Sequence, residues 1–254
     1  MWPIQLTFPP EVLVLILAVF LLAGFVKGTV GLGLPTVSLA LLTATMGLKE
    51  AIALMLIPAI ATNIFQALNG PYFKSIVRRL CLFLLPVCFG TWAGARVLAD
   101  GDAGTLAALL GIVLVFYAGL SLTRLRVPPP GRWERVLNPL VGLIAGVMTG
   151  LTGSFVVPGS LYLQALDLPR EELVQALGIS FAIVTVALFT ALGSHGLVTA
   201  ELGITSAIAV IPAGLGMTIG TKLRHRLPEK LYRRMFFVAL LIMGLYITGR
   251  SFLL

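Results

Sequence analysis

Acidic side chains are scarce in this sequence, and none falls in the middle of a long apolar run. There are 10 aspartate and glutamate residues among 254, and each lies at or near the end of an apolar segment. An acidic residue at the centre of a membrane span usually marks a proton relay or a cation site. The sequence therefore favours neither of these devices.

Metal-binding and nucleophilic residues are also few, with two histidines and two cysteines in the whole chain. His195 and His225 fall in separate predicted loops, and no His-x-x-His or Cys-x-x-Cys pattern occurs. An enzyme working inside a membrane needs a nucleophile with a base, paired carboxylates or a metal cluster. We therefore expect no catalytic site, no metal and no cofactor.

Apolar residues, by contrast, fill most of the chain. It is 58% hydrophobic and 11% charged, whereas a soluble domain averages about 25% charged residues. The net charge of +8 is distributed between the apolar runs rather than gathered on one surface, which favours membrane orientation over nucleic-acid binding. We predict an all-α polytopic protein of the cell (plasma or inner) membrane.

The sequence repeats one plan twice. Residues 23–31 (AGFVKGTVG) and 145–153 (AGVMTGLTG) share an alanine and three glycines at equal spacing, and a proline follows each, at Pro35 and Pro158. Further matched residues are Pro86, Gly90, Gly94 and Arg96 in the first copy and Pro212, Gly216, Gly220 and Lys222 in the second.

A basic, proline-rich stretch separates the two copies. Residues 128–131 read Pro-Pro-Pro-Gly, which a helix does not continue through. We predict a first repeat at 1–125, a cytoplasmic linker at 126–135 and a second repeat at 136–254, all within one membrane domain.

Each repeat contains five apolar segments, of which the second is short. The segments are 11–27, 34–46, 50–68, 80–98 and 103–123, then 136–150, 155–166, 172–193, 203–221 and 231–249. A helix of about 13 residues is roughly 20 Å long, less than the hydrocarbon thickness. We predict in each repeat a glycine-broken helical hairpin followed by three transmembrane helices; whether the short segment turns back or stops midway stays open.

The basic residues favour one topology. If the first two segments of each repeat return the chain to its starting side, most lysines and arginines share one face, and only Lys49, Arg96 and Arg250 lie on the other. Both termini are then outside and the two repeats are inverted. Inverted repeats with broken helices are a common plan of secondary transporters.

The duplicated motif carries a resemblance to a known family. Residues 28–35 (GTVGLGLP) and 150–158 (GLTGSFVVP) resemble the signature of the TauE/SafE family of sulfite and organosulfonate exporters. The likeness extends to the chain length and to the Pro-x-x-x-Gly-x-x-x-Gly pattern of the fourth segment. It implies a transporter of sulfite or a related sulfur-containing or carboxylated anion.

The glycine breaks are candidate anion sites. A helix that starts after a glycine turn points its first N–H groups at the break, and glycine lets an anion approach the backbone closely. The alternative is that these glycines are packing contacts between helices. The candidate substrate-binding residues at the breaks are Thr29, Gly31, Gly33, Thr152, Gly153 and Ser154.

Three polar residues near the first break complete the candidate site. Asn63 and Gln66 lie at helical spacing in an apolar segment and should face the protein interior, to bind substrate or to hydrogen-bond another helix. Lys27, whose counterpart is Thr149, either pairs with the anion or snorkels to the interface.

The leading hypothesis is a secondary transporter that exports a small anion, sulfite or an organosulfonate, by alternating access between inverted repeats. The alternatives are an anion channel or a permease for a small carboxylate. A membrane enzyme or a scaffold subunit is less consistent with the duplicated breaks. The expected partners are the small anion and the bilayer, and the oligomeric state stays open.

Overall fold

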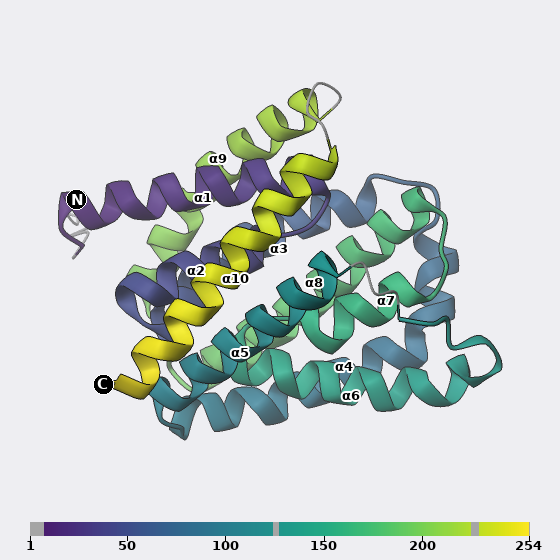
Figure 1. Ribbon diagram of the computed structural model, residues 1–254. Coiled ribbons are helices and arrows are strands. Elements are labelled where there is room, and N and C mark those ends of the chain that lie inside the picture. Colours follow the sequence, from purple (N-terminus) through teal and green to yellow (C-terminus); the bar gives the residue numbers. More distant parts are fainter. Residues whose placement is uncertain (1–7, 124–126, 225–228, 254) are drawn as a thin grey trace.

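All regular secondary structure in the part of the chain that the structure describes is helical. The computed structural model describes residues 8–123, 127–224 and 229–253 (Figure 1). Arg126 of the predicted linker and His225 lie outside these residues. Within the described ranges, 8 helices are long and apolar enough to cross a membrane, which confirms an all-α polytopic membrane protein.

Two short helices interrupt the series of long ones, as the sequence predicts. The helices are α1 (Pro10–Val30), α2 (Leu34–Met46), α3 (Leu48–Leu68), α4 (Phe73–Asp100), α5 (Ala103–Leu122), α6 (Glu134–Thr152), α7 (Leu161–Ala165), α8 (Arg170–Ser194), α9 (Ala200–Leu223) and α10 (Glu229–Leu253). The largest departure from prediction is α4, which begins seven residues earlier than the apolar run because its first two turns are basic.

The first hairpin turns back fully. α1 ends at Gly31, whose φ of 87° only glycine adopts easily, and the carbonyl of Gly31 accepts a hydrogen bond from Gln66 in the last turn of α3. α2 starts after Gly33 and ends at Met46, next to the first turn of α3. α2 therefore runs antiparallel to α3, back toward the side where α1 begins.

The second hairpin also returns, but by a different backbone path. α6 ends at Gly153 with a φ of 72°, and a π-helical turn, Val156–Ser160, with extended backbone at Val157 leads into α7, which has only 5 residues. The carbonyl of Leu166 lies 3.5 Å from the guanidinium of Arg79, near the start of α4. The short segment predicted at 155–166 is therefore helical but not one continuous α-helix, because the extended backbone at Val157 interrupts it.

The chain path gives the bundle two chemically different ends. The N- and C-termini lie on the same side in Figure 1, which we call the termini end. At this end Lys49 Nζ donates to the carbonyl of Ala99, and Arg250 donates to that of Ala44. The opposite, linker end collects most of the described basic residues, namely Lys74, Arg78, Arg79, Arg132, Arg135, Arg170, Lys222 and Arg224.

Glycines let two pairs of helices touch backbone to backbone. A Cβ atom added to Gly24 or Gly28 of α1 would lie 2.1 or 2.2 Å from a carbonyl oxygen of α9. A Cβ atom added to Gly146 or Gly150 of α6 would lie 2.2 or 2.4 Å from a carbonyl oxygen of α4. Under the alignment of the repeats, the α1–α9 contacts become the α6–α4 contacts when the halves are exchanged.

The alternative interpretation, that the glycines of the motif are packing contacts between helices, therefore holds for only some of them. Gly28 and Gly150 are close helix contacts, whereas Gly31 and Gly153 are left-handed turns that end α1 and α6. The most buried spans are α3 and α8, in which 61% and 72% of the residues of the apolar span are buried inside the protein. These two helices therefore form the centre of the bundle.

Candidate anion-binding site

A buried lysine lies just before the first break. Lys27 is in the last turn of α1 and only 3% exposed. Its Nζ atom donates to the hydroxyl of Thr62 at 3.2 Å and to the side-chain oxygen of Asn63 on α3. The side chain thus points into the protein, so the snorkelling interpretation was wrong.

The partners of Lys27 are neutral. Between described residues the structure contains one ion pair, Arg79–Glu134, so no described carboxylate balances the lysine. A buried cation held only by neutral groups is costly, because its lost hydration is incompletely replaced. An anion placed beside Nζ would supply the missing opposite charge.

Asn63 and Gln66 both face the interior, as expected, but they do different things. Gln66 donates from its amide nitrogen to the carbonyls of Gly31, at 3.1 Å, and of Val174, at 2.7 Å. It therefore ties the break to α3 and α8. The amide nitrogen of Asn63 is buried and has no hydrogen-bond partner among the described residues, so it is a donor available beside Lys27.

The remaining predicted residues of the first break shape it rather than offer donors. The hydroxyl of Thr29 donates to the carbonyl of Val26 at 2.9 Å. Gly33 has a φ of 117° and precedes α2, whose start has no side-chain cap. Among the described residues, α2 is the only regular helix of ordinary length that begins at either break, because α7 has 5 residues. The first turn of α2 contains Pro35, which has no N–H, and its remaining first N–H groups point toward the break.

The second break has the same turn but different chemistry. The hydroxyl of Thr152 donates to its own helix at the carbonyl of Met148, while the Ser154 hydroxyl is buried without a partner among the described residues. Phe155 follows, and its ring packs against Phe83 and Phe181 with centroids 6.2 and 5.1 Å away. Aromatic rings and hydroxyl groups thus occupy the second break, and no cation does among the described residues.

The two breaks lie at different depths along α3. Gly31 contacts Gln66, whereas a Cβ atom on Gly153 would lie 2.7 Å from the Ile52 side chain. Residues 52 and 66 are separated by roughly 21 Å of helix. The predicted site residues therefore form two groups: Lys27, Thr29, Gly31, Gly33, Asn63 and Gln66 at the first break, and Thr152, Gly153 and Ser154 at the second.

Sequence reasoning missed Thr62. Its hydroxyl accepts from Lys27 and donates to the carbonyl of Pro58 at 2.7 Å, so it links the lysine to the proline inside α3. The available signal was its position next to Asn63 in an otherwise apolar segment. No cluster of three or more metal-ligating side chains occurs in the described ranges.

These features define a polytopic helical membrane protein with a buried lysine and an unpartnered amide donor at a broken helix. The chain belongs to the sulfite exporter TauE/SafE family, whose family model matches residues 16–247 and thus both breaks. The family consists of membrane transporters, not enzymes. Searches of curated proteins and of solved structures found no match.

Proposed function

We propose that the protein exports a small anion, sulfite or an organosulfonate, and that the anion binds at the first break. The observation that carries this proposal is the buried Lys27, which has neutral partners and an unused amide donor on Asn63 beside it. A sulfite or sulfonate group has several oxygen acceptors, so it can accept from both side chains at once.

The remaining first-break residues have supporting roles in this proposal. The start of α2 adds the partial positive charge of a helix N-terminus. Gln66 holds the Gly31 turn in place through its two hydrogen bonds, and Gly31 and Gly33 keep side chains out of the anion's way. We assign Thr152, Gly153 and Ser154 to the route of the anion through the protein. At the second break, hydroxyl groups would contact the anion transiently.

The two halves move as inverted repeats in this account. The exchange of the α1–α9 and α6–α4 contacts between halves supports a two-fold relation between the repeats 1–125 and 136–254. The concentration of basic residues at the linker end favours a cytoplasmic linker and both termini outside. Rocking of one repeat against the other would then expose the first break to each side in turn.

The membrane potential is sufficient to drive export. Moving one negative charge outward gains about 2.3 kcal/mol per 100 mV of inside-negative potential, and a dianion gains about twice that. Coupling to a proton relay through an intramembrane carboxylate is not needed for a steep outward gradient.

The test is sulfite efflux from proteoliposomes that contain only this protein, at a set potential. We expect saturable efflux that rises as the interior becomes more negative. Flux that does not saturate would favour a channel. If folded protein transports simple carboxylates but not sulfite, the proposed substrate is wrong and a carboxylate takes its place. The absence of any anion flux would contradict the proposed function.

A further inference from the structure

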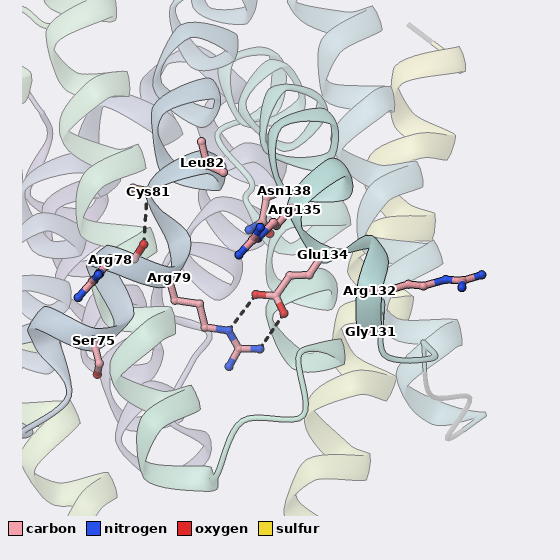
Figure 2. Close-up of a pocket in the computed structure, with 10 residues that line it drawn as sticks. All are labelled: Ser75, Arg78, Arg79, Cys81, Leu82, Gly131, Arg132, Glu134, Arg135 and Asn138. Carbon is pink, nitrogen blue, oxygen red and sulfur yellow. Dashed lines mark hydrogen bonds and ion pairs between the residues drawn. The ribbon is translucent and has the colours of Figure 1, made fainter.

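A cleft of about 810 Å³ opens at the linker end, away from both breaks (Figure 2). It lies between the start of α4 and the start of α6, and none of the predicted site residues lines it. The residues of its lining that matter here are Arg78, Arg79, Leu82, Arg132, Glu134 and Arg135.

The cleft is strongly cationic. It contains four guanidinium groups and one carboxylate, a formal excess of three positive charges. Nε and Nη2 of Arg79 donate to the two oxygens of Glu134 at 2.8 and 2.9 Å, so this arginine is already paired. Figure 2 shows Arg135 directed from α6 toward α4, whereas the side chains of Arg78 and Arg132 extend outward at the two sides of the cleft.

An apolar surface continues from each side of the cleft toward the middle of the bundle. On α4, Leu82, Leu85 and Phe89 follow Arg78 at helical spacing, and all three are at least half exposed. On α6, Val136, Leu140 and Leu143 follow Arg132 in the same way and are similarly exposed. An arginine thus precedes each apolar stripe: Arg78 in the second turn of α4, and Arg132 in the short 3-10 turn Gly131–Trp133 just before α6.

Trp133 marks the depth of the cleft in the membrane. It is 57% exposed, and the guanidinium of Arg132 lies 5.6 Å from the centroid of its ring. Exposed tryptophan beside arginine is typical of the boundary between lipid headgroups and acyl chains.

The matching helix pair at the other end lacks this chemistry. α1 and α9 pack through glycines as α6 and α4 do, but their first turns carry Glu11 and Glu201 and no basic residue. The cationic character of the cleft is therefore not a by-product of the helix packing, and among the described residues the first turns of α1 and α9 do not share it.

We propose that this cleft binds the headgroup of an anionic phospholipid, with the acyl chains along the apolar stripes of α4 and α6. Arg135, directed across the cleft, contacts the phosphate, Arg78 adds positive charge at its side, and the Arg79–Glu134 pair keeps the two helix starts together. A free anion has the charge to enter the cleft but has no use for the two apolar stripes that continue from it. The lipid fits both features.

The test is mass spectrometry of the intact protein with equal amounts of phosphatidylglycerol and phosphatidylcholine that have the same acyl chains. We expect wild type to retain phosphatidylglycerol preferentially, and the double variant Arg78→Gln/Arg135→Gln to lower that preference at least about tenfold. The double variant Lys49→Gln/Arg96→Gln, at the termini end, should leave it within about twofold. Absence of a preference in wild type, or equal losses in both double variants, would overturn the proposal.

Excess sulfite in the same experiment separates the lipid from a free anion. The proposal predicts that sulfite leaves the bound phosphatidylglycerol in place, whereas displacement by sulfite would assign the cleft to the transported anion instead. Thermal unfolding checks that the arginine variant is folded. If it is not, Arg135→Gln alone should lower the preference about threefold or more, and an unchanged preference would contradict the assignment.

Discussion

The two glycine breaks have the same backbone turn and opposite chemistry. Gly31 and Gly153 both end a long helix with a positive φ. Beside the first lies a buried lysine with an amide donor; beside the second lies a phenylalanine packed among aromatic rings. The duplication has thus kept the turn, which glycine imposes, while the side chains around it have diverged.

This difference teaches that a sequence repeat predicts geometry better than it predicts chemistry. Glycine is needed at both turns because a Cβ atom is disfavoured at positive φ. Nothing in the turn itself requires a cation, so one break is able to carry Lys27 and the other Thr149. The anion site that we propose is therefore asymmetric although both breaks share the glycine turn.

Replacing the lysine should give the largest effect on transport. We predict that Lys27→Met lowers sulfite efflux at least tenfold, about 1.4 kcal/mol, because it removes the only described cation at either break. The midpoint of thermal unfolding should stay the same or rise, since a buried charge is removed. Thr149→Val at the matched position should keep efflux within about twofold; equal losses in both variants would break the comparison.

Replacing Gly31 or Gly153 by alanine should lower the free energy of unfolding by different amounts at the two breaks. Gly31→Ala meets no atom closer than 3.7 Å and should cost about 1–2 kcal/mol through its positive φ alone. Gly153→Ala places Cβ 2.7 Å from Ile52, which adds about 1–3 kcal/mol of overpacking. Chemical unfolding of the two variants measures this, and a less stable Gly31→Ala would contradict the described packing.

Pro58 lies in α3 between the two breaks, and the stability of the helix there should depend on one hydroxyl. Pro58 has no N–H to donate to the carbonyl of Leu54, and Ser206 of α9 donates to it instead at 2.7 Å. We predict that Ser206→Ala lowers the free energy of unfolding by about 1–3 kcal/mol, because a buried carbonyl loses its partner. Ser75→Ala, whose hydroxyl is exposed, should change it by less than about 0.5 kcal/mol. Equal changes in the two variants would exclude this role for Ser206.

A cap far from both breaks should show the smallest effect. Asp102 accepts from the backbone and hydroxyl of Thr105 at the start of α5, which lowers the pKa of its carboxyl. Because the pKa is lower in the folded state, the stabilisation is present above the unfolded-state pKa of about 3.9 and is lost as the pH falls below it. Asp102→Ala should lower the unfolding midpoint slightly at neutral pH, progressively less in acid, and should leave sulfite efflux unchanged. A midpoint difference that grows in acid would contradict this assignment.

Much of the fold could be predicted from the sequence because it depends on local signals. Apolar length sets the long helices, and the glycine spacing locates both breaks; α2 occupies its predicted residues, 34–46. The irregular path over 155–166 could not be predicted, because tertiary packing around Phe155 decides it.

The sequence predicted which residues belong to the candidate site, but not how they are arranged in space. Lys27 and Asn63 are 36 positions apart, and the sequence alone gives no distance between them. The choice between snorkelling and burial depends on the angle at which α1 meets α3, which is a tertiary property. The separation of the two breaks along α3 likewise follows from the return of both hairpins, which the sequence left open.

The most direct test of the account supplies Lys27 with an internal counter-ion. Asn63→Asp keeps the size of the side chain but places a carboxylate beside the lysine, where we propose that the anion binds. Counterflow of labelled sulfite in proteoliposomes should fall at least about tenfold, while the unfolding midpoint stays the same or rises. Counterflow at the wild-type rate, from a folded variant, would show that the transported anion does not bind beside Lys27.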